Sequence, residues 1–232
     1  MSSISKVFCG ELDGIEARLI EVETDINVGL HSFTIVGLAD KALSEAKERV
    51  NSALKNTDVK PPNQENRRIV INLAPADIKK AGSQYDAAIS VGYLLASDQI
   101  KKFDSSKKLF FGELSLDGRF RPVNGVLSMA RLAERIGFKE LFVPESNARE
   151  AAIVRGVTVF PVSTLAALVA HLEDKVLLSP QPHTELDRLY EVPFVTIDEV
   201  KGHGTAKRAL MIAAAGGHNL IMVGPPGTGK TM

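Results

Sequence analysis

Residues 219–231 read Asn-Leu-Ile-Met-Val-Gly-Pro-Pro-Gly-Thr-Gly-Lys-Thr, a short apolar run followed by a glycine-rich loop. Residues 224–231 match the pattern G-x-x-x-x-G-K-[ST], which forms a phosphate-binding loop when it directly follows a strand. The run Asn219–Val223 predicts that strand, compact and buried. The alternative is a glycine- and proline-rich turn without a chemical role, but it requires strand, spacing, lysine and threonine to coincide by chance.

The residue types of this loop suit a nucleoside triphosphate held with Mg²⁺. Glycines let backbone N–H groups curl around phosphate oxygens, Lys230 brings a positive charge to the β- and γ-phosphates, and the Thr231 hydroxyl can bind Mg²⁺. We therefore expect ATP and Mg²⁺ as cofactors. The candidate nucleotide-binding residues are Gly224, Pro225, Pro226, Gly227, Thr228, Gly229, Lys230 and Thr231, with Thr231 as the metal ligand.

The sequence ends one residue after Thr231, and no Walker B carboxylate, sensor residue or arginine finger follows the loop. These groups anchor Mg²⁺ and stabilise the charge of the transition state. We therefore expect the 232-residue chain by itself to hydrolyse no ATP. The strand Asn219–Val223 also lacks parallel neighbours, so the segment after about Val195 is expected to be loosely held.

Working back from the loop, the chain divides into three sections. A small-residue helix is expected over Thr205–Ala215, and residues 196–232 form the start of a second domain. Residues 175–195 are polar and interrupted by prolines, which indicates a linker. Residues 1–174 form the first domain, in which strand-like and helix-like patterns alternate, and this alternation predicts an α/β layer fold.

Several elements of the first domain can be placed by their spacing. The dipeptide Asp117-Gly118 between two apolar segments predicts a hairpin, and Asp40 is a candidate cap for a helix. We expect strands at 33–37, 68–73, 140–143 and 157–162, a helix with apolar positions between Leu43 and Leu54, and helices at 85–97, 126–136, 148–154 and 164–172.

The overall composition excludes several protein classes. The chain has 28 Lys+Arg against 28 Asp+Glu and is 44% hydrophobic, which is typical of a globular protein. No apolar run reaches the roughly 18 residues of a membrane span, and no secretory signal opens the chain. The single Cys9 excludes an internal disulfide and a cysteine-based zinc site. We therefore expect a cytoplasmic protein without a membrane partner.

With these residues in view, the sequence resembles the ComM/YifB family, the magnesium-chelatase-like AAA+ ATPases of bacteria. Each motif alone is weakly specific, but the order and spacing of all of them over essentially the whole chain are specific to the family. The motifs that carry the resemblance are Phe33–Leu38, Ile71–Asp77, Gln84–Asp86, Gly112–Leu114, Ala206–Leu210, Ala213–Leu220 and the glycine-rich loop.

The resemblance implies a Lon protease-like N-terminal domain of the ribosomal-protein-S5 domain 2 type, followed by the opening of a P-loop AAA+ motor. It implies homo-hexameric rings and, in the ComM branch, a DNA helicase that promotes branch migration when transforming DNA is recombined. It also implies that the segment Val200–His203 approaches the adenine of ATP. The partners would be DNA, single-stranded or branched, and further copies of the chain.

Lon-type domains can be proteases with a serine nucleophile and a lysine base. Aligning this chain on that pattern places Asp86 where the serine would stand and Leu127 where the lysine would stand. Ser83 and Ser90 lie close in sequence, but a serine without a base is inert. We therefore expect no peptidase activity.

Paired lysines are candidate DNA contacts. Lys79 and Lys80 would face the channel of a ring and bind the phosphate backbone, although most such pairs are solvated surface charge. Asp77, Asp86 and Glu113 could serve acid–base chemistry but more often fix loops. Tyr85, Phe110 and Phe111 could stack on bases, although aromatics in apolar segments usually fill cores.

Two other functions stay open at this point. The first is a magnesium-chelatase subunit, which inserts Mg²⁺ into a porphyrin; that resemblance resides in the AAA+ segment, and the extra Lon-like N-terminal domain argues against it. The chain could also be a non-enzymatic assembly module.

Overall fold

The computed structural model describes residues 3–38, 40, 43, 45–57, 59–64, 66–185 and 196–230. The chain forms two compact units, Met1–Leu186 and Asp187–Met232, which are considered separately. Thr231 and the part of the expected linker at 186–195 lie outside the described residues.

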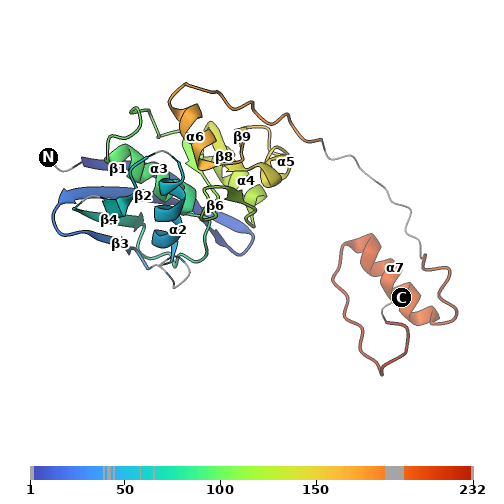
Figure 1. The fold of residues 1–232 in the computed structure, drawn as a ribbon. Coiled ribbons are helices and arrows are strands. Elements are labelled where there is room, and N and C mark those ends of the chain that lie inside the picture. The colour runs from blue at the N-terminus through green and yellow to red at the C-terminus, as the bar shows by residue number, and fades with distance from the viewer. Residues whose placement is uncertain are drawn as a thin grey trace. The chain divides into compact units, whose positions relative to one another are not determined.

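A mixed sheet of seven strands forms the first unit (Figure 1). Its strand order is β3-β4-β2-β1-β5-β8-β9. The pairs β3–β4, β1–β5, β5–β8 and β8–β9 are parallel, whereas β1–β2 and β2–β4 are antiparallel. The strands are β1 (Ser3–Asp13), β2 (Glu16–Val28), β3 (Ser32–Val36), β4 (Arg67–Ala74), β5 (Lys108–Phe110), β8 (Glu140–Pro144) and β9 (Thr158–Val162).

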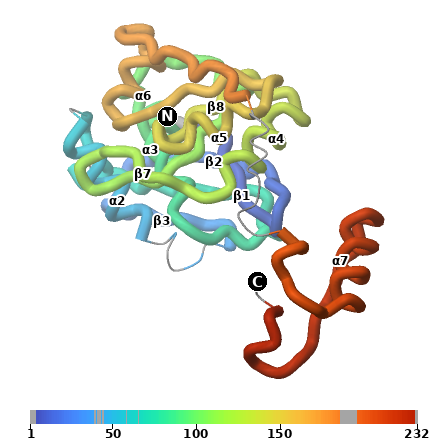
Figure 2. The backbone as a smooth tube through the Cα atoms, turned by 90° about the vertical axis from the view of Figure 1, so that its right-hand side faces the viewer, coloured from blue at the N-terminus to red at the C-terminus, as the bar shows by residue number. Residues whose placement is uncertain are grey.

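Helices connect and cover these strands, as the tube view also shows (Figure 2). They are α2 (Ala46–Lys55), α3 (Asp86–Ala96), α4 (Val126–Ile136), α5 (Ala148–Ala151) and α6 (Leu165–Leu172), with short 3₁₀ turns at Pro62–Gln64 and Glu145–Asn147. A small hairpin of β6 (Glu113–Leu114) and β7 (Phe120–Arg121) turns at Asp117-Gly118, where Gly118 has φ 82°. The α/β class and the hairpin predicted from the sequence are confirmed.

The core lies between the sheet and the helices that pack on it, with α3 at its centre. All eleven residues of α3 are buried, because the helix packs against β1 and β2 and also contacts α2. On β2, burial alternates with a period of two, and Ile20, Val22 and Ile26 are among its covered side chains. The apolar run around Ile71 belongs to β4, which lies next to the terminal strand β3.

The start of α6 depends on a side-chain cap at Thr164. The hydroxyl Oγ1 of Thr164 accepts a hydrogen bond from the N–H of Ala167 at 3.1 Å. We expect Thr164→Ala to lower the free energy of unfolding by about 1 kcal/mol, because one N–H of the first turn loses its partner. Urea denaturation followed by circular dichroism measures this loss. Thr164→Ser keeps the acceptor and serves as control; an equal loss in both variants would contradict a capping role.

The segment after α6, expected to be the beginning of a linker, is held against the first unit. We call residues 178–185 the C-terminal strap. Three backbone N–H groups of the strap donate to the body of the unit: Leu178 to Nδ1 of His171 (3.0 Å), Gln181 to the carbonyl of Val159 (2.8 Å) and Thr184 to the carbonyl of Ala152 (3.0 Å). The strap thus runs along β9, at one edge of the sheet. The boundaries at residues 174 and 196 themselves stay predictions.

The second unit contains helix α7 (Gly204–Gly216), close to its expected range. The run Asn219–Val223 forms no strand among the described residues, so the expected compact strand is wrong for this chain. Ile221 and Val223 are 88% and 92% exposed. A parallel strand needs hydrogen-bonded neighbours on the same sheet, and the described part of this unit supplies none.

Candidate functional site

The glycine-rich loop bends sharply at two of its glycines. Gly227 and Gly229 have φ values of 79° and 74°, which only glycine adopts without strain. The hydroxyl of Thr228 donates to the carbonyl of Pro225 at 2.9 Å. These features fix a tight bend in which the backbone carries no bulky side chain at its two sharpest positions.

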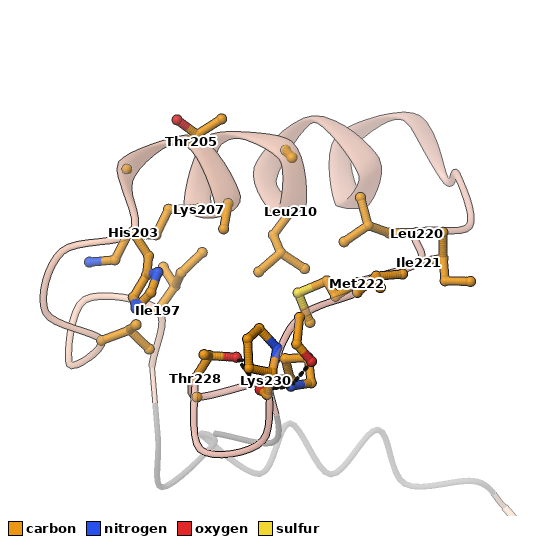
Figure 3. Close-up of a pocket in the computed structure, with 18 residues that line it drawn as sticks. Ile197, His203, Thr205, Lys207, Leu210, Leu220, Ile221, Met222, Thr228 and Lys230 are labelled. Carbon is orange, nitrogen blue, oxygen red and sulfur yellow. Dashed lines mark hydrogen bonds between the residues drawn. The ribbon is translucent and has the colours of Figure 1, made fainter.

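The ammonium group of Lys230 closes this bend (Figure 3). Its Nζ donates to the carbonyl of Gly224 at 2.9 Å and to that of Pro225 at 2.6 Å, and it lies 3.2 Å from Oγ1 of Thr228. Lys230 thus holds its charge at the mouth of the loop. These carbonyl contacts are exposed to solvent, so the ammonium can exchange them for an anionic oxygen at little cost.

A cavity of about 710 Å³ opens beside the loop. One wall is the start of α7, where His203 takes the N-cap position with φ 52° and its carbonyl accepts a hydrogen bond from the N–H of Lys207 at 2.9 Å. A helix N-terminus carries a partial positive charge. Apolar side chains complete the lining, and Figure 3 shows Ile197, Leu210, Leu220 and Met222 around it.

The described residues of this site fit a nucleotide. Gly227 has no atom within 4 Å of the place that a Cβ would take, so its backbone is open to a close approach by phosphate oxygens. Lys230 supplies the cation, and the apolar lining suits the flat face of a base. Of the predicted site residues, the structure brings Gly224, Pro225, Thr228, Gly229 and Lys230 together around the cavity; the metal ligand Thr231 lies outside the described residues.

The two lysines proposed as DNA contacts differ in their surroundings. Lys79 is exposed, but Lys80 is fully buried, and its Nζ donates to the carbonyl of Pro75. Burial lowers the pKa of Lys80 because it disfavours the charged form. A buried ammonium cannot contact a DNA phosphate, so the solvent-facing placement expected for Lys80 is wrong. The contact proposed for Lys79 stays a prediction.

At the position aligned with a protease serine, Asp86 forms a buried ion pair. Arg49 of α2 donates to both carboxylate oxygens, Nε to Oδ2 at 2.7 Å and Nη2 to Oδ1 at 3.0 Å, and the N–H of Leu114 also donates to Oδ2. Burial raises the pKa of Asp86 to about 6, and Arg49 opposes that rise. Asp86 therefore joins α2, α3 and β6 and has a structural role. Leu127, aligned with the lysine base, lies in α4 and is partly buried.

A second polar cluster was not expected from the sequence. The buried carboxylate of Glu11 accepts hydrogen bonds from the hydroxyl of Tyr85 and from the N–H of Ala81, and Ser83 donates to Glu113. Burial raises the pKa of Tyr85, as it does that of Cys9. Tyr85, Phe110 and Phe111 are at most 1% exposed, so these three aromatic side chains fill the core and are not placed to stack on bases.

Comparison with known protein families gives two matches along the chain. Residues 22–147 match the family described as subunit ChlI of Mg-chelatase, and residues 196–232 match the family of magnesium chelatase, subunit ChlI. The first match covers more than half of the 232 residues. The second contains the glycine-rich loop and the cavity beside it.

Individual relatives agree with these matches. The chain is 39% identical to the competence protein ComM of Haemophilus influenzae over 99% of its own length, and 38% identical to YifB of Escherichia coli over 99%. It spans slightly less than half of these relatives, 45% and 44% of their lengths. A weaker similarity, 28% identity over 66% of the chain and 22% of the relative, links it to the archaeal Lon protease of Methanocaldococcus jannaschii.

The family matches and the near-complete alignment with ComM and YifB agree with the motifs that carried the resemblance. The chain therefore belongs to the ComM/YifB family of magnesium-chelatase-like AAA+ proteins.

Proposed function

We propose that this chain is the N-terminal part of a hexameric AAA+ ATPase that acts on DNA as a helicase and branch-migration factor during natural transformation and recombination. The observation that carries the proposal is the loop at Gly224–Lys230, bent at two glycines with positive φ and closed by a lysine ammonium. The name of the relative ComM, a competence protein, supports the link to transformation.

The roles of the chain's own residues follow from the site. When bound, ATP with Mg²⁺ would supply the free energy of phosphoanhydride hydrolysis. Lys230 would exchange its carbonyl contacts at Gly224 and Pro225 for phosphate oxygens, and the backbone of Gly227 and Gly229 would allow their close approach. The cavity wall at Val200–His203 would take the base, and Thr231 would bind the metal. Hydrolysis would need groups that lie beyond Thr231 in the complete motor.

For the first unit, we propose the Lon-like fold of the ribosomal-protein-S5 domain 2 type without peptidase activity. The similarity to Lon proteases supports the fold. The ion pair of Asp86 with Arg49 supports the loss of the reaction, because a carboxylate held by a guanidinium offers no hydroxyl to attack a peptide. This unit would form the ring or guide DNA, with Lys79 as a candidate phosphate contact.

A magnesium-chelatase subunit is the second candidate, because both matched families carry that description. Its substrates would be a porphyrin and Mg²⁺ in place of DNA. A third possibility, a non-enzymatic assembly module, needs no nucleotide.

The complete gene product distinguishes these functions in one set of assays. We expect Mg-dependent ATP hydrolysis that rises with branched or single-stranded DNA, a six-subunit mass by native mass spectrometry, and movement of a labelled four-way junction. Lys79→Ala should weaken DNA binding and flatten its salt dependence. Stimulation by a porphyrin with metal insertion, and none by DNA, would favour the chelatase; no nucleotide binding at all would leave the assembly module.

A further inference from the structure

The C-terminal strap begins at a side-chain acceptor, the imidazole of His171. His171 lies in the last turn of α6, which packs beside β9 (Figure 1). The chain turns back after this helix, and the N–H of Leu178 donates to Nδ1 of His171 at 3.0 Å. A backbone N–H can only donate, so Nδ1 is the ring nitrogen without a proton, and the proton lies on Nε2. The contact therefore requires the neutral form of His171.

The surroundings of this imidazole favour the neutral form. Its ring lies against two aromatic rings, with centroid separations of 5.4 Å to Phe142 and 4.8 Å to Phe160. Burial lowers the pKa of His171 below its ordinary value, because it disfavours the charged form. At neutral pH, His171 is therefore ready to accept the N–H of the strap.

The charged groups that face His171 do not offset its burial. They are Lys108 of β5, Glu140 of β8 and Asp174, which follows α6. Glu140 is paired with Lys108, and Asp174 accepts a hydrogen bond from Nζ of Lys101 at 3.0 Å. Both carboxylates near the ring are thus already bound to a lysine. Protonation of His171 would add a charge without a free partner among these groups, and it would turn Nδ1 into a donor that faces the N–H of the strap.

A second histidine, His183, lies within the strap itself and provides a contrast. Its Nδ1 donates to the carbonyl of Ala152 at 2.8 Å, and Nε of Arg155 donates to its Nε2 at 3.1 Å. Both His183 and Arg155 are exposed. Arg155 can therefore move away when Nε2 takes up a proton, and the hydrogen bond to Ala152 remains. Protonation of His183 thus weakens the strap less than protonation of His171.

We propose that His171 is a pH-sensitive clasp for the C-terminal strap. The neutral imidazole holds the N–H of Leu178 and keeps the strap on the edge of β9; the protonated imidazole releases the strap and uncovers the carbonyl of Val159. The docked strap excludes the proton, so docking is strongest above about pH 6.5 and weakens as the pH falls below that value. One such histidine lowers the docking constant by up to about tenfold between about pH 7.5 and about pH 5.5. The clasp requires neither nucleotide nor DNA.

Hydrogen exchange of the strap amides tests the clasp in the 232-residue chain. The protection factors of Leu178, Gln181 and Thr184, which correct for the intrinsic effect of pH on exchange, should fall by up to about tenfold from about pH 7.5 to about pH 5.5. Those of the buried helix α3 should not fall. His171→Asn keeps an acceptor that does not titrate, so its strap should be protected equally at both pH values. His183→Asn is the matched control and should keep the loss seen in wild type.

The titration of His171 itself provides a second readout. Leu178→Pro removes the N–H that donates to Nδ1, so the neutral imidazole loses its partner. An NMR titration of the ring should then show a higher midpoint than in wild type, whereas Leu178→Ala, which keeps the N–H, should stay closer to wild type. Equal strap protection at the two pH values in wild type, an undiminished acid response in His171→Asn, or an unchanged midpoint in Leu178→Pro would overturn the proposal.

Discussion

Replacing Arg49 by methionine is expected to lower the free energy of unfolding by about 3–5 kcal/mol at neutral pH. The carboxylate of Asp86 has 0% side-chain exposure and receives two hydrogen bonds from this guanidinium. Without Arg49, the buried carboxyl group of Asp86 would lose both guanidinium hydrogen bonds and keep the N–H of Leu114 as its remaining close donor among the described residues. Urea denaturation followed by circular dichroism measures the loss.

A double variant and a change of pH distinguish whether Arg49 stabilises the fold through its charge next to Asp86 or through packing of its side chain. Arg49→Met with Asp86→Asn removes both charges and keeps an acceptor for Leu114, so it should recover most of the lost stability. Burial already raises the pKa of Asp86 to about 6, above its unfolded value of about 3.9. Ionisation of Asp86 therefore costs stability as pH rises from about 4 toward 6, and the cost disappears below about pH 4.

In Arg49→Met, the pKa of Asp86 should rise further, because the opposing guanidinium is gone. The stability difference from wild type should therefore shrink when the pH is lowered from about 7.5 to about 5. A difference of equal size at both pH values would mean that Arg49 acts through packing alone.

Lys230→Ala is expected to reduce ATP hydrolysis by the complete gene product by at least about 100-fold. Lys230 is the cation of the loop, and its Nζ already lies at the carbonyls of Gly224 and Pro225, where phosphate oxygens would enter. The folded structure should not change, because the side chain is exposed. Steady-state phosphate release and titration with a fluorescent ATP analogue give the two measurements.

Arg208→Ala is the matched control, because Arg208 carries the same charge, is exposed on α7 and is not part of the cavity lining. It should keep hydrolysis within a few-fold of wild type. Unchanged nucleotide binding and hydrolysis in Lys230→Ala would refute the assignment of the loop as a phosphate site.

Local elements of the first unit could be predicted because their residues satisfy local rules. Helix α4 has its predicted ends, since Gly125 and Gly137 flank an amphipathic run and both adopt positive φ. The hairpin at Asp117-Gly118 followed from its turn residues. The strand order could not be predicted, because β1 pairs with both β2 and β5, and the second pairing is fixed by tertiary packing.

The errors have the same origin in distant contacts. Lys80 was expected on the surface because it is charged, yet the carbonyl of Pro75 and the surrounding fold bury it. The contacts of the strap to Val159 and Ala152 could not be predicted either, because those residues are remote in sequence; the expected linker at 175–195 itself stays a prediction. An aspartate at the start of a mostly apolar helix was a usable sign of the ion pair, because a buried Asp86 needs a cation and Arg49 is available on the preceding helix.

The C-terminal strap determines where this protein can be divided. A shortened chain ending at Asp174 would keep every strand and helix of the sheet yet lose the N–H of Gln181 from the carbonyl of Val159. Among the described residues, the backbone of such a fragment would be unpaired at both edges of the sheet, β3 and β9, and these edges would pair between molecules and form fibres. Expression of the isolated unit should therefore extend at least to Glu185, and laboratory truncation at the apparent end of α6 would yield insoluble material.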